Sequence, residues 1–188
     1  MEIQIIVDSC CDTTPALRRA MRFVIAPLTV SAGDASFCDD GHIEIPQLLA
    51  AMKATNQPAA SACPSPESYA ALMRAAEASV VVTLSSKLSG SYNAACVARD
   101  MVLEEYPEKK IHVLDSQSAS AGELRQALLL RQLIDGGLSF EEVVEKAEVF
   151  ADSMKTFFVL EDLSNLVKNG RISKVAGLMG TMLSIRPI

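Results

Sequence analysis

The chain has 188 residues, of which 49% are hydrophobic and 21% are charged. This composition is typical of one globular domain or slightly more, and it excludes an intrinsically disordered chain. The 23 acidic residues outnumber the 17 basic ones, which gives a net charge of −6. That charge argues against binding to a nucleic-acid backbone or an anionic membrane surface, but it is compatible with a small anionic ligand.

Runs of β-branched residues predict strands, and helical spacing with helix-start signals predicts helices. In chain order, strands are expected at 2–7, 23–30, 78–84, 111–114 and 156–160, and helices are expected to begin near 15, 45, 66, 91, 122, 140 and 162. Pro27 makes the second strand an edge strand or a bent one, and 57–66 is expected to be a loop. Two helix starts are well marked, by Ser65-Pro66 and by the Ser139/Glu142 capping box.

The order strand, loop, helix recurs at least four times along these predicted elements. This recurrence predicts an α/β fold with a mostly parallel sheet flanked by helices. No apolar stretch approaches the roughly 18 residues of a membrane span, so we expect no integral membrane segment. An odd number of cysteines, no CxxC pair and no signal peptide at Met1 lead us to expect a cytoplasmic protein.

In an open α/β sheet, ligands bind beyond the carboxyl ends of the strands, where helix N-termini converge. The loops expected there are 8–11, 61–65, 85–91 and 115–118, and all are rich in hydroxyl groups and poor in basic residues. Such loops can hold one carboxylate or phosphate through hydrogen bonds. The phosphate-binding patterns GxxxxGK[ST] and GxGxxG and the nucleophile pattern GxSxG are absent. Spacing alone therefore predicts an anion-binding α/β domain.

Each of these features also has a structural interpretation. Ser residues at helix starts are commonly caps, and Asp8 and Asp115 can accept backbone N–H bonds within their own turns. His112 lies within a predicted strand and is expected to be structural. The adjacent pair Cys10-Cys11 is expected to fill buried space rather than to act as a redox site.

Five segments together, and in the same order, resemble the DegV family of bacterial fatty-acid-binding proteins. They are IIVDSCCDTT (5–14), SACPSPESY (61–69), LSSKLSGSYNAA (84–95), LEDLSNLVKNGRIS (160–173) and the closing LSIRPI (183–188). The resemblance implies two α/β domains with a long-chain fatty acid, such as palmitate, between them. It places the N-terminal domain at 1–155 and the beginning of a lipid-covering domain at 156–188, with the C-terminal third of the family pattern lacking.

The resemblance also implies a site. Ser61 and Ser89 match the family residues that hold the fatty-acid carboxylate, and Ser61 replaces the commoner Thr. The expected pocket or head-group region consists of Ala62, Gly90, Ser91, Asp8, Ser9, Ser116 and Arg171. No catalytic residue, metal or cofactor is implied. The implied partner is a separate kinase subunit that phosphorylates the presented carboxylate to an acyl phosphate, so that the chain is itself a non-catalytic carrier.

Two alternatives remain open at this point. The chain could be an enzyme for a small phosphorylated or carboxylated metabolite, with Asp8 as base or metal ligand at the strand ends. Against this reading, no acid–base pair and no nucleophile–His pair can be recognised in the sequence. Alternatively, a chain that lacks part of the family pattern could have only scaffold or interaction value, with exposed apolar surface and self-association.

Overall fold

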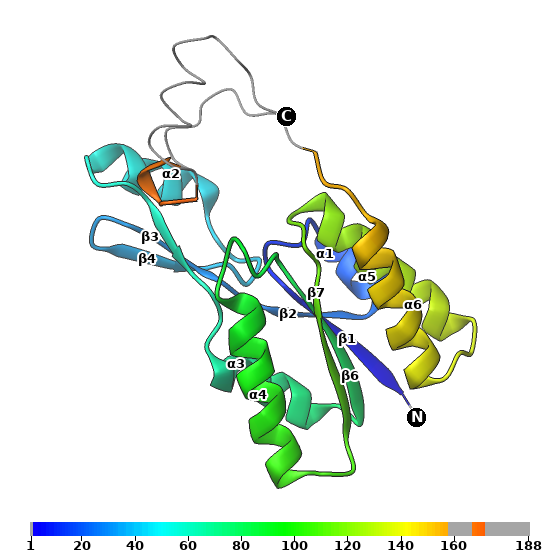
Figure 1. Ribbon diagram of the computed structural model, residues 1–188. Coiled ribbons are helices and arrows are strands. Elements are labelled where there is room, and N and C mark those ends of the chain that lie inside the picture. Colours follow the sequence, from blue (N-terminus) through cyan, green and yellow to red (C-terminus); the bar gives the residue numbers. More distant parts are fainter. Residues whose placement is uncertain (1, 158–166, 172–188) are drawn as a thin grey trace.

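The central layer of the protein is a four-stranded parallel sheet in the order β2-β1-β6-β7, seen in the computed structural model of Figure 1. The structure describes residues 2–157 and 167–171. The strands of this sheet are β1 (Ile3–Asp8), β2 (Phe23–Ala26), β6 (Ala78–Thr83) and β7 (Lys110–Asp115). Because all four strands run in the same direction, their carboxyl ends and the loops that follow them share one edge of the sheet.

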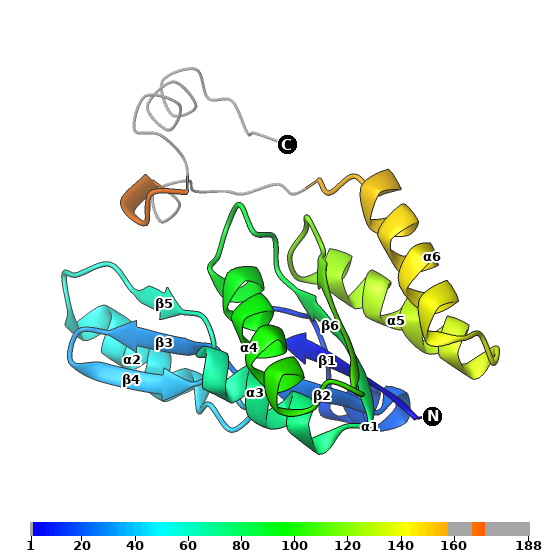
Figure 2. The same ribbon diagram turned by 60° about the horizontal axis from the view of Figure 1, so that its bottom comes forward.

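Helices cover both faces of this sheet (Figures 1 and 2). On one face lie α3 (Pro66–Ala75) and α4 (Ser91–Glu105), and on the other lie α1 (Pro15–Met21), α5 (Ala121–Asp135) and α6 (Phe140–Ser153). Successive strand residues point to opposite faces, so Ile6 and Val81 pack towards α3 and α4, whereas Ile5 and Val80 pack towards α5 and α6. All residues of β6 are buried, which is consistent with its central run of three valines. The expected α/β fold is confirmed.

A second, smaller sheet lies beside the first and is antiparallel, in the order β4-β3-β5. It consists of β3 (Thr29–Ala32), β4 (Ala35–Cys38) and β5 (Ala60–Ala62), and α2 (Ile45–Ala54) packs against β3. β2 is an edge strand, as Pro27 led us to expect. The prediction of a single strand over 23–30 was wrong, because β2 ends at Ala26 and the chain then enters this second sheet at Thr29. The prediction of a loop over 57–66 was also wrong in part, because β5 pairs with β3 there.

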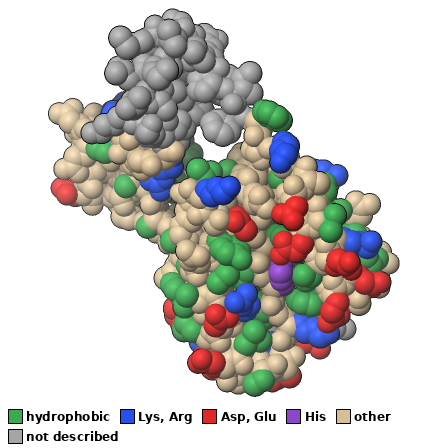
Figure 3. Space-filling view, viewed as in Figure 1, with side chains coloured by type: hydrophobic (Ala, Val, Ile, Leu, Met, Phe, Trp, Pro, Cys, Tyr) green, Lys and Arg blue, Asp and Glu red, His purple; other side chains and the backbone are tan. Residues whose placement is uncertain are grey.

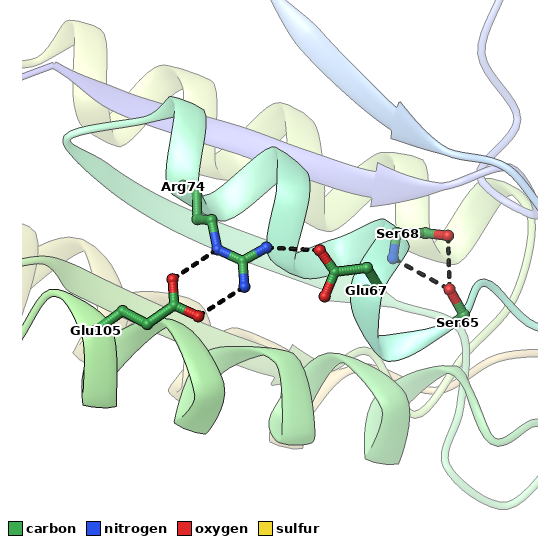
Figure 4. Close-up of polar contacts among 5 residues, drawn as sticks. All are labelled: Ser65, Glu67, Ser68, Arg74 and Glu105. Atoms are coloured by element: carbon green, nitrogen blue, oxygen red, sulfur yellow. Dashed lines mark hydrogen bonds and ion pairs between the residues drawn. The ribbon is translucent and has the colours of Figure 1, made fainter.

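The two well-marked helix starts are confirmed. The Ser65 side chain accepts the N–H of Ser68 at 3.1 Å with Pro66 at the first helical position, and Ser139 and Glu142 form their capping box. In Figure 4, Arg74 of α3 donates to Glu67 on its own helix and holds Glu105 of α4 with two nitrogens. This exposed pairing orients the two helices relative to each other and adds little stability.

None of the described helices combines the length and apolarity needed to cross a bilayer. On the face shown in Figure 3, acidic and basic side chains of the described residues are interspersed rather than gathered in one basic surface. Most of the strand predicted at 156–160 and of the helix predicted at 162–168 lies outside the described residues. The division at residues 155 and 156 therefore stays a prediction.

Candidate functional site

A mainly apolar cavity of about 550 Å³ lies at the carboxyl-terminal edge of the large sheet, where it meets the small sheet. It is lined by Leu28, Val30, Ala59, Ala60, Ser61, Ala62, Cys63, Leu84, Leu88, Ser89, Gly90, Asn169 and Arg171. The lining comes from four segments of the described chain that are far apart in the sequence: 28–30 at β3, 59–63 around β5, 84–90 after β6, and 169–171. A cavity of this size at a sheet edge has the dimensions of a small-molecule site.

The cavity brings together five of the residues singled out from the sequence: Ser61, Ala62, Ser89, Gly90 and Arg171. Ser61 lies on β5, where it pairs with Val30 of β3. The role of Ser61 as a carboxylate ligand, like the role of every residue predicted for the site, stays a prediction.

Ser89 lies in a tight turn that follows β6. The N–H groups of Leu88 and Ser89 both donate to the carbonyl of Ser85, at 2.9 and 3.1 Å, which gives the segment a fixed helical turn. The N–H of Ser91 donates to the Ser89 Oγ at 3.2 Å. Because the Ser89 Oγ accepts this bond, its own hydroxyl hydrogen is free to be donated to a ligand oxygen.

The N-terminus of α4 lies directly after this turn, at the cavity. Gly90 is the N-cap of this 15-residue helix, makes no side-chain cap, and is followed by a first turn without acidic residues. A Cβ atom at Gly90 would lie 3.4 Å from the Cys63 Sγ, so the two loops approach closely at this residue. The partial positive charge of the helix end therefore faces the cavity without a competing carboxylate.

Asp8 and Ser91, both predicted for the head-group region, lie fully buried outside the cavity lining. The Ser91 hydroxyl donates to Asp8 Oδ2 at 2.8 Å, and the N–H of Leu84 donates to the same oxygen at 2.9 Å. The Tyr69 hydroxyl lies 2.6 Å from the Ser91 Oγ. Tyr69 is the donor of this bond, because the Ser91 hydroxyl hydrogen is already donated to Asp8. Asp8 thus ties down both ends of the segment that carries Ser89.

Burial raises the pKa of Asp8, and the N–H of Leu84 and the hydroxyl of Ser91 oppose that shift. The Asp8 Oδ1 accepts the N–H of Cys10 at 3.1 Å, so both carboxylate oxygens are engaged. A fully buried carboxylate with three donors cannot reach a substrate in the cavity. This geometry argues against Asp8 as the base of an enzyme.

Ser9 and Ser116 also lie outside the cavity lining. The Ser9 Oγ accepts the N–H of Leu28 at 3.0 Å and so holds a residue that does line the cavity. Ser116 is buried and exchanges hydrogen bonds with the backbone of Ser118. The Asp115 Oδ1 accepts the N–H of Gln117 in its own turn and the N–H of Ser86 in the loop after β6. The observed contacts of these side chains are thus hydrogen bonds to the backbone of turns and loops, as expected of structural residues.

Arg171 is the only charged residue among the described residues that line the cavity. It is exposed, its Nε donates to the Leu88 carbonyl at 3.4 Å, and another of its nitrogens donates to the Asn169 carbonyl at 2.8 Å. Its cationic group therefore stands at the rim of the cavity, beside the turn that carries Ser89.

Apart from the thiol of Cys63, which lines the cavity, the cysteine and histidine side chains considered in the sequence lie outside the cavity lining. Burial raises the pKa of Cys10 to about 12 and raises that of Cys11 as well, so both remain thiols at neutral pH. The Nε2 of His112 lies 2.7 Å from a carboxylate oxygen of Glu148, an ion-pair geometry that links β7 to α6. No general acid–base pair faces the cavity within residues 2–157 and 167–171.

A sequence model of the DegV family, described as uncharacterised proteins, matches residues 2–188. The chain belongs to the DegV family. A DegV domain-containing protein of Streptococcus pneumoniae strain R6 is 43% identical over 192 residues, which cover all of this chain and 68% of the relative. A DegV domain-containing protein of Streptococcus pyogenes serotype M3 is 39% identical over 191 residues with the same coverage.

Solved DegV structures share the fold. The Streptococcus pneumoniae fatty acid kinase (Fak) B3 protein loaded with linoleic acid matches with a TM-score of 0.86 at 42% identity, over 95% of this chain and 64% of that one. A Ruminococcus gnavus DegV protein with vaccenic acid matches with a TM-score of 0.85 at 41% identity, over 92% and 62%. This DegV chain therefore spans less than two thirds of the length of these solved relatives.

Several residues of this DegV site were not predicted from the sequence, among them Cys63 and Tyr69. Cys63 lines the cavity and Tyr69 supports Ser91 from below. Both lie inside the motif segment 61–69, so their position was available from the motif. What the motif could not supply is the contact of Tyr69 with a residue 22 positions further along the chain.

Proposed function

We propose that this chain binds one long-chain fatty acid in the cavity, with its carboxylate at Ser61 and Ser89, and presents it to a separate kinase subunit. The observation that carries the proposal is that both hydroxyls line one apolar cavity at the N-terminus of α4. Several DegV relatives are named for bound linoleic, vaccenic or heptadecanoic acid, which supports this class of ligand. The chain has no catalytic role of its own in this proposal, and it acts in the cytoplasm.

The head group is recognised by hydrogen-bond donors rather than by a buried cation. Ser89 offers its hydroxyl hydrogen, Ser61 offers a second hydroxyl, and the end of α4 supplies partial positive charge. Arg171 at the rim adds a longer-range attraction for a carboxylate. This set of donors orients the carboxylate and leaves it accessible to a second protein.

The tail supplies most of the affinity. Burial of about fifteen carbons at roughly 0.8 kcal/mol each gives on the order of 12 kcal/mol, from which several are lost to immobilisation. Side chains of Leu28, Val30, Leu84 and Leu88 provide apolar lining for the first part of that tail.

Mass spectrometry of the protein under native conditions after expression in bacteria tests this function. We expect a copurified acyl chain in the wild-type protein and a large loss of it in Ser89→Ala and Ser61→Ala. Ser86→Ala is the matched control, because Ser86 is exposed on the same turn and outside the cavity lining. Equal lipid content in Ser89→Ala and Ser86→Ala would reject Ser89 as a carboxylate ligand.

Presentation to a partner is tested separately. With a fatty acid kinase catalytic subunit, ATP and lipid-loaded protein, we expect acyl phosphate only when both proteins are present. Acyl phosphate formed by this chain alone would contradict the carrier role, and lipid binding without transfer to any such kinase would limit the function to storage.

A further inference from the structure

A second carboxyl group lies beside Asp8 in the interior. Glu123, in the first turn of α5, is fully buried, and its side chain comes within 4.8 Å of those of Asp8 and Cys10. The Glu123 Oε1 accepts the N–H of Ser120 at 3.2 Å. The Glu123 Oε2 is buried and has no hydrogen-bond partner among the described residues. A buried carboxyl oxygen without a hydrogen bond costs much more free energy when the group is ionised than when it is neutral.

The charges around this pair do not balance if both acids are ionised. Glu123 interacts with the ionisable groups of Asp8, Cys10 and Cys11, from β1 and the turn after it, and of Tyr69 from α3. None of these groups can carry a positive charge. None of the ion pairs of the described residues includes Asp8 or Glu123. Two buried like charges at this separation cannot both persist, so one acid keeps its proton.

The hydrogen bonds decide which acid that is. Asp8 receives two backbone N–H groups and one hydroxyl hydrogen, which is the environment of an ionised carboxylate. Glu123 receives one N–H and leaves one oxygen unpartnered, which is the environment of a neutral acid. Burial, and then the negative charge of Asp8, raise the pKa of Glu123 to about 10, in agreement with this assignment.

We propose that Glu123 is a neutral carboxylic acid that allows Asp8 to remain an internal carboxylate, and that it is thereby a positioning residue for the Ser89 turn. Asp8 accepts hydrogen bonds from the N–H of Leu84 before this turn and from the hydroxyl of Ser91 after it. The N–H of Ser91 in turn donates to the Ser89 Oγ and so orients the Ser89 hydroxyl. Removal of the Glu123 proton puts two negative charges in the interior and weakens this anchor. The consequence for fatty-acid retention rests on the proposed function, whereas the protonation of Glu123 does not.

The first test needs no ligand. The infrared C=O stretch of a neutral carboxylic acid is expected in the wild-type protein at neutral pH and is expected to be absent in Glu123→Gln. Glu145→Gln, at an exposed position of α6, is the matched control and should keep the band. The same band in all three proteins, or in none, would overturn the assignment of the proton to Glu123.

The second test is the pH dependence of stability. The folded acid keeps its proton while the unfolded acid releases it, so this group lowers stability progressively as pH rises from 4.5 towards about 10. The urea midpoint of the wild type should therefore fall more steeply with pH than that of Glu123→Gln. Parallel curves would overturn the proposal. A melting temperature that rises with added Zn²⁺ or Mg²⁺ in the wild type but not in Glu123→Gln would also overturn it, because a cation would then replace the proton.

The third test links the proton to the site. Retained fatty acid should decrease from neutral pH to about pH 10 in the wild type and in Glu145→Gln, and this decrease should be smaller in Glu123→Gln. An equal decrease in all three would contradict the positioning role. A wild-type protein without any fatty acid would contradict the proposed function alone, since the infrared band and the stability curves would still report on Glu123.

Discussion

The two sheets of the molecule differ in how they are stabilised. The four-stranded sheet is buried on both faces, and its central strand β6 has no exposed residue. The small sheet has little core of its own: α2 has no buried residue, and Ile45, Leu49 and Met52 on that helix are 56%, 48% and 38% exposed. The larger sheet therefore contributes most of the free energy of unfolding. The smaller sheet contributes little to it, but it forms part of the cavity wall, including Ser61.

A matched pair of methionines tests this difference most directly. Met73 on α3 is fully buried, whereas Met52 on α2 is 38% exposed. Met73→Ala should lower the free energy of unfolding by about 2–5 kcal/mol, because it removes buried surface and leaves a cavity. Met52→Ala should change it by less than about 0.5 kcal/mol. Urea denaturation of both variants measures the contrast, and similar losses would show that α2 has a core after all.

A steric test concerns the tight contact between α5 and the turn after β7. A Cβ atom at Gly122 would lie 1.8 Å from the Ser118 Oγ and 2.8 Å from the Ser118 Cβ. Gly122→Ala should therefore cost about 1–3 kcal/mol through overpacking. Gly137, where a Cβ meets nothing within 4 Å, is unsuitable as a control because its φ is +79°. Ser118→Ala in the same background should recover part of the loss, and no recovery would contradict a clash with that side chain.

The large sheet was predictable and the small one was not, for a physical reason. Ala78 to Thr83 forms an apolar, β-branched run because both of its faces are buried. By contrast, β5 reads Ala60-Ser61-Ala62, and all three residues are exposed, so no pattern marks it as a strand. Its strand conformation comes from pairing with β3, which is tertiary context that overrides local preference.

The site shows the same division. The prediction that Ser61 and Ser89 bind the carboxylate together came from the family resemblance. The spacing of the predicted elements alone predicted only that an anion binds at the carboxyl-terminal edge of the sheet. The contact from Asp8 to Ser91 joins residues 83 positions apart, and that of Tyr69 joins residues 22 apart. Neither could be deduced from local pattern, because both depend on how α3 and α4 pack on the sheet.

The link between the stable core and the site can be broken at one hydroxyl. Tyr69→Phe removes the donor to the Ser91 Oγ while keeping the buried ring. We expect a loss of about 0.5–1.5 kcal/mol in the free energy of unfolding and a measurable drop in retained fatty acid. Tyr106→Phe, at a 41% exposed position, is the control and should change neither quantity. A stability loss without any change in lipid content would show that the site does not depend on this contact.

The smallest effect, a change in reactivity without a change in stability, concerns two cysteines of the small-sheet region. Cys63 lines the cavity and lies next to Gly90, whereas Cys38 ends β4, is exposed, and is not part of the lining. A bound fatty acid should therefore slow the alkylation of Cys63 by a maleimide and leave that of Cys38 unchanged, as measured by peptide mass spectrometry. Equal protection of both would indicate a global change in the protein rather than occupation of the cavity. Protection of neither by a fatty acid that demonstrably binds would contradict a head group at Ser61 and Ser89, because Cys63 lines the same cavity and lies against Gly90.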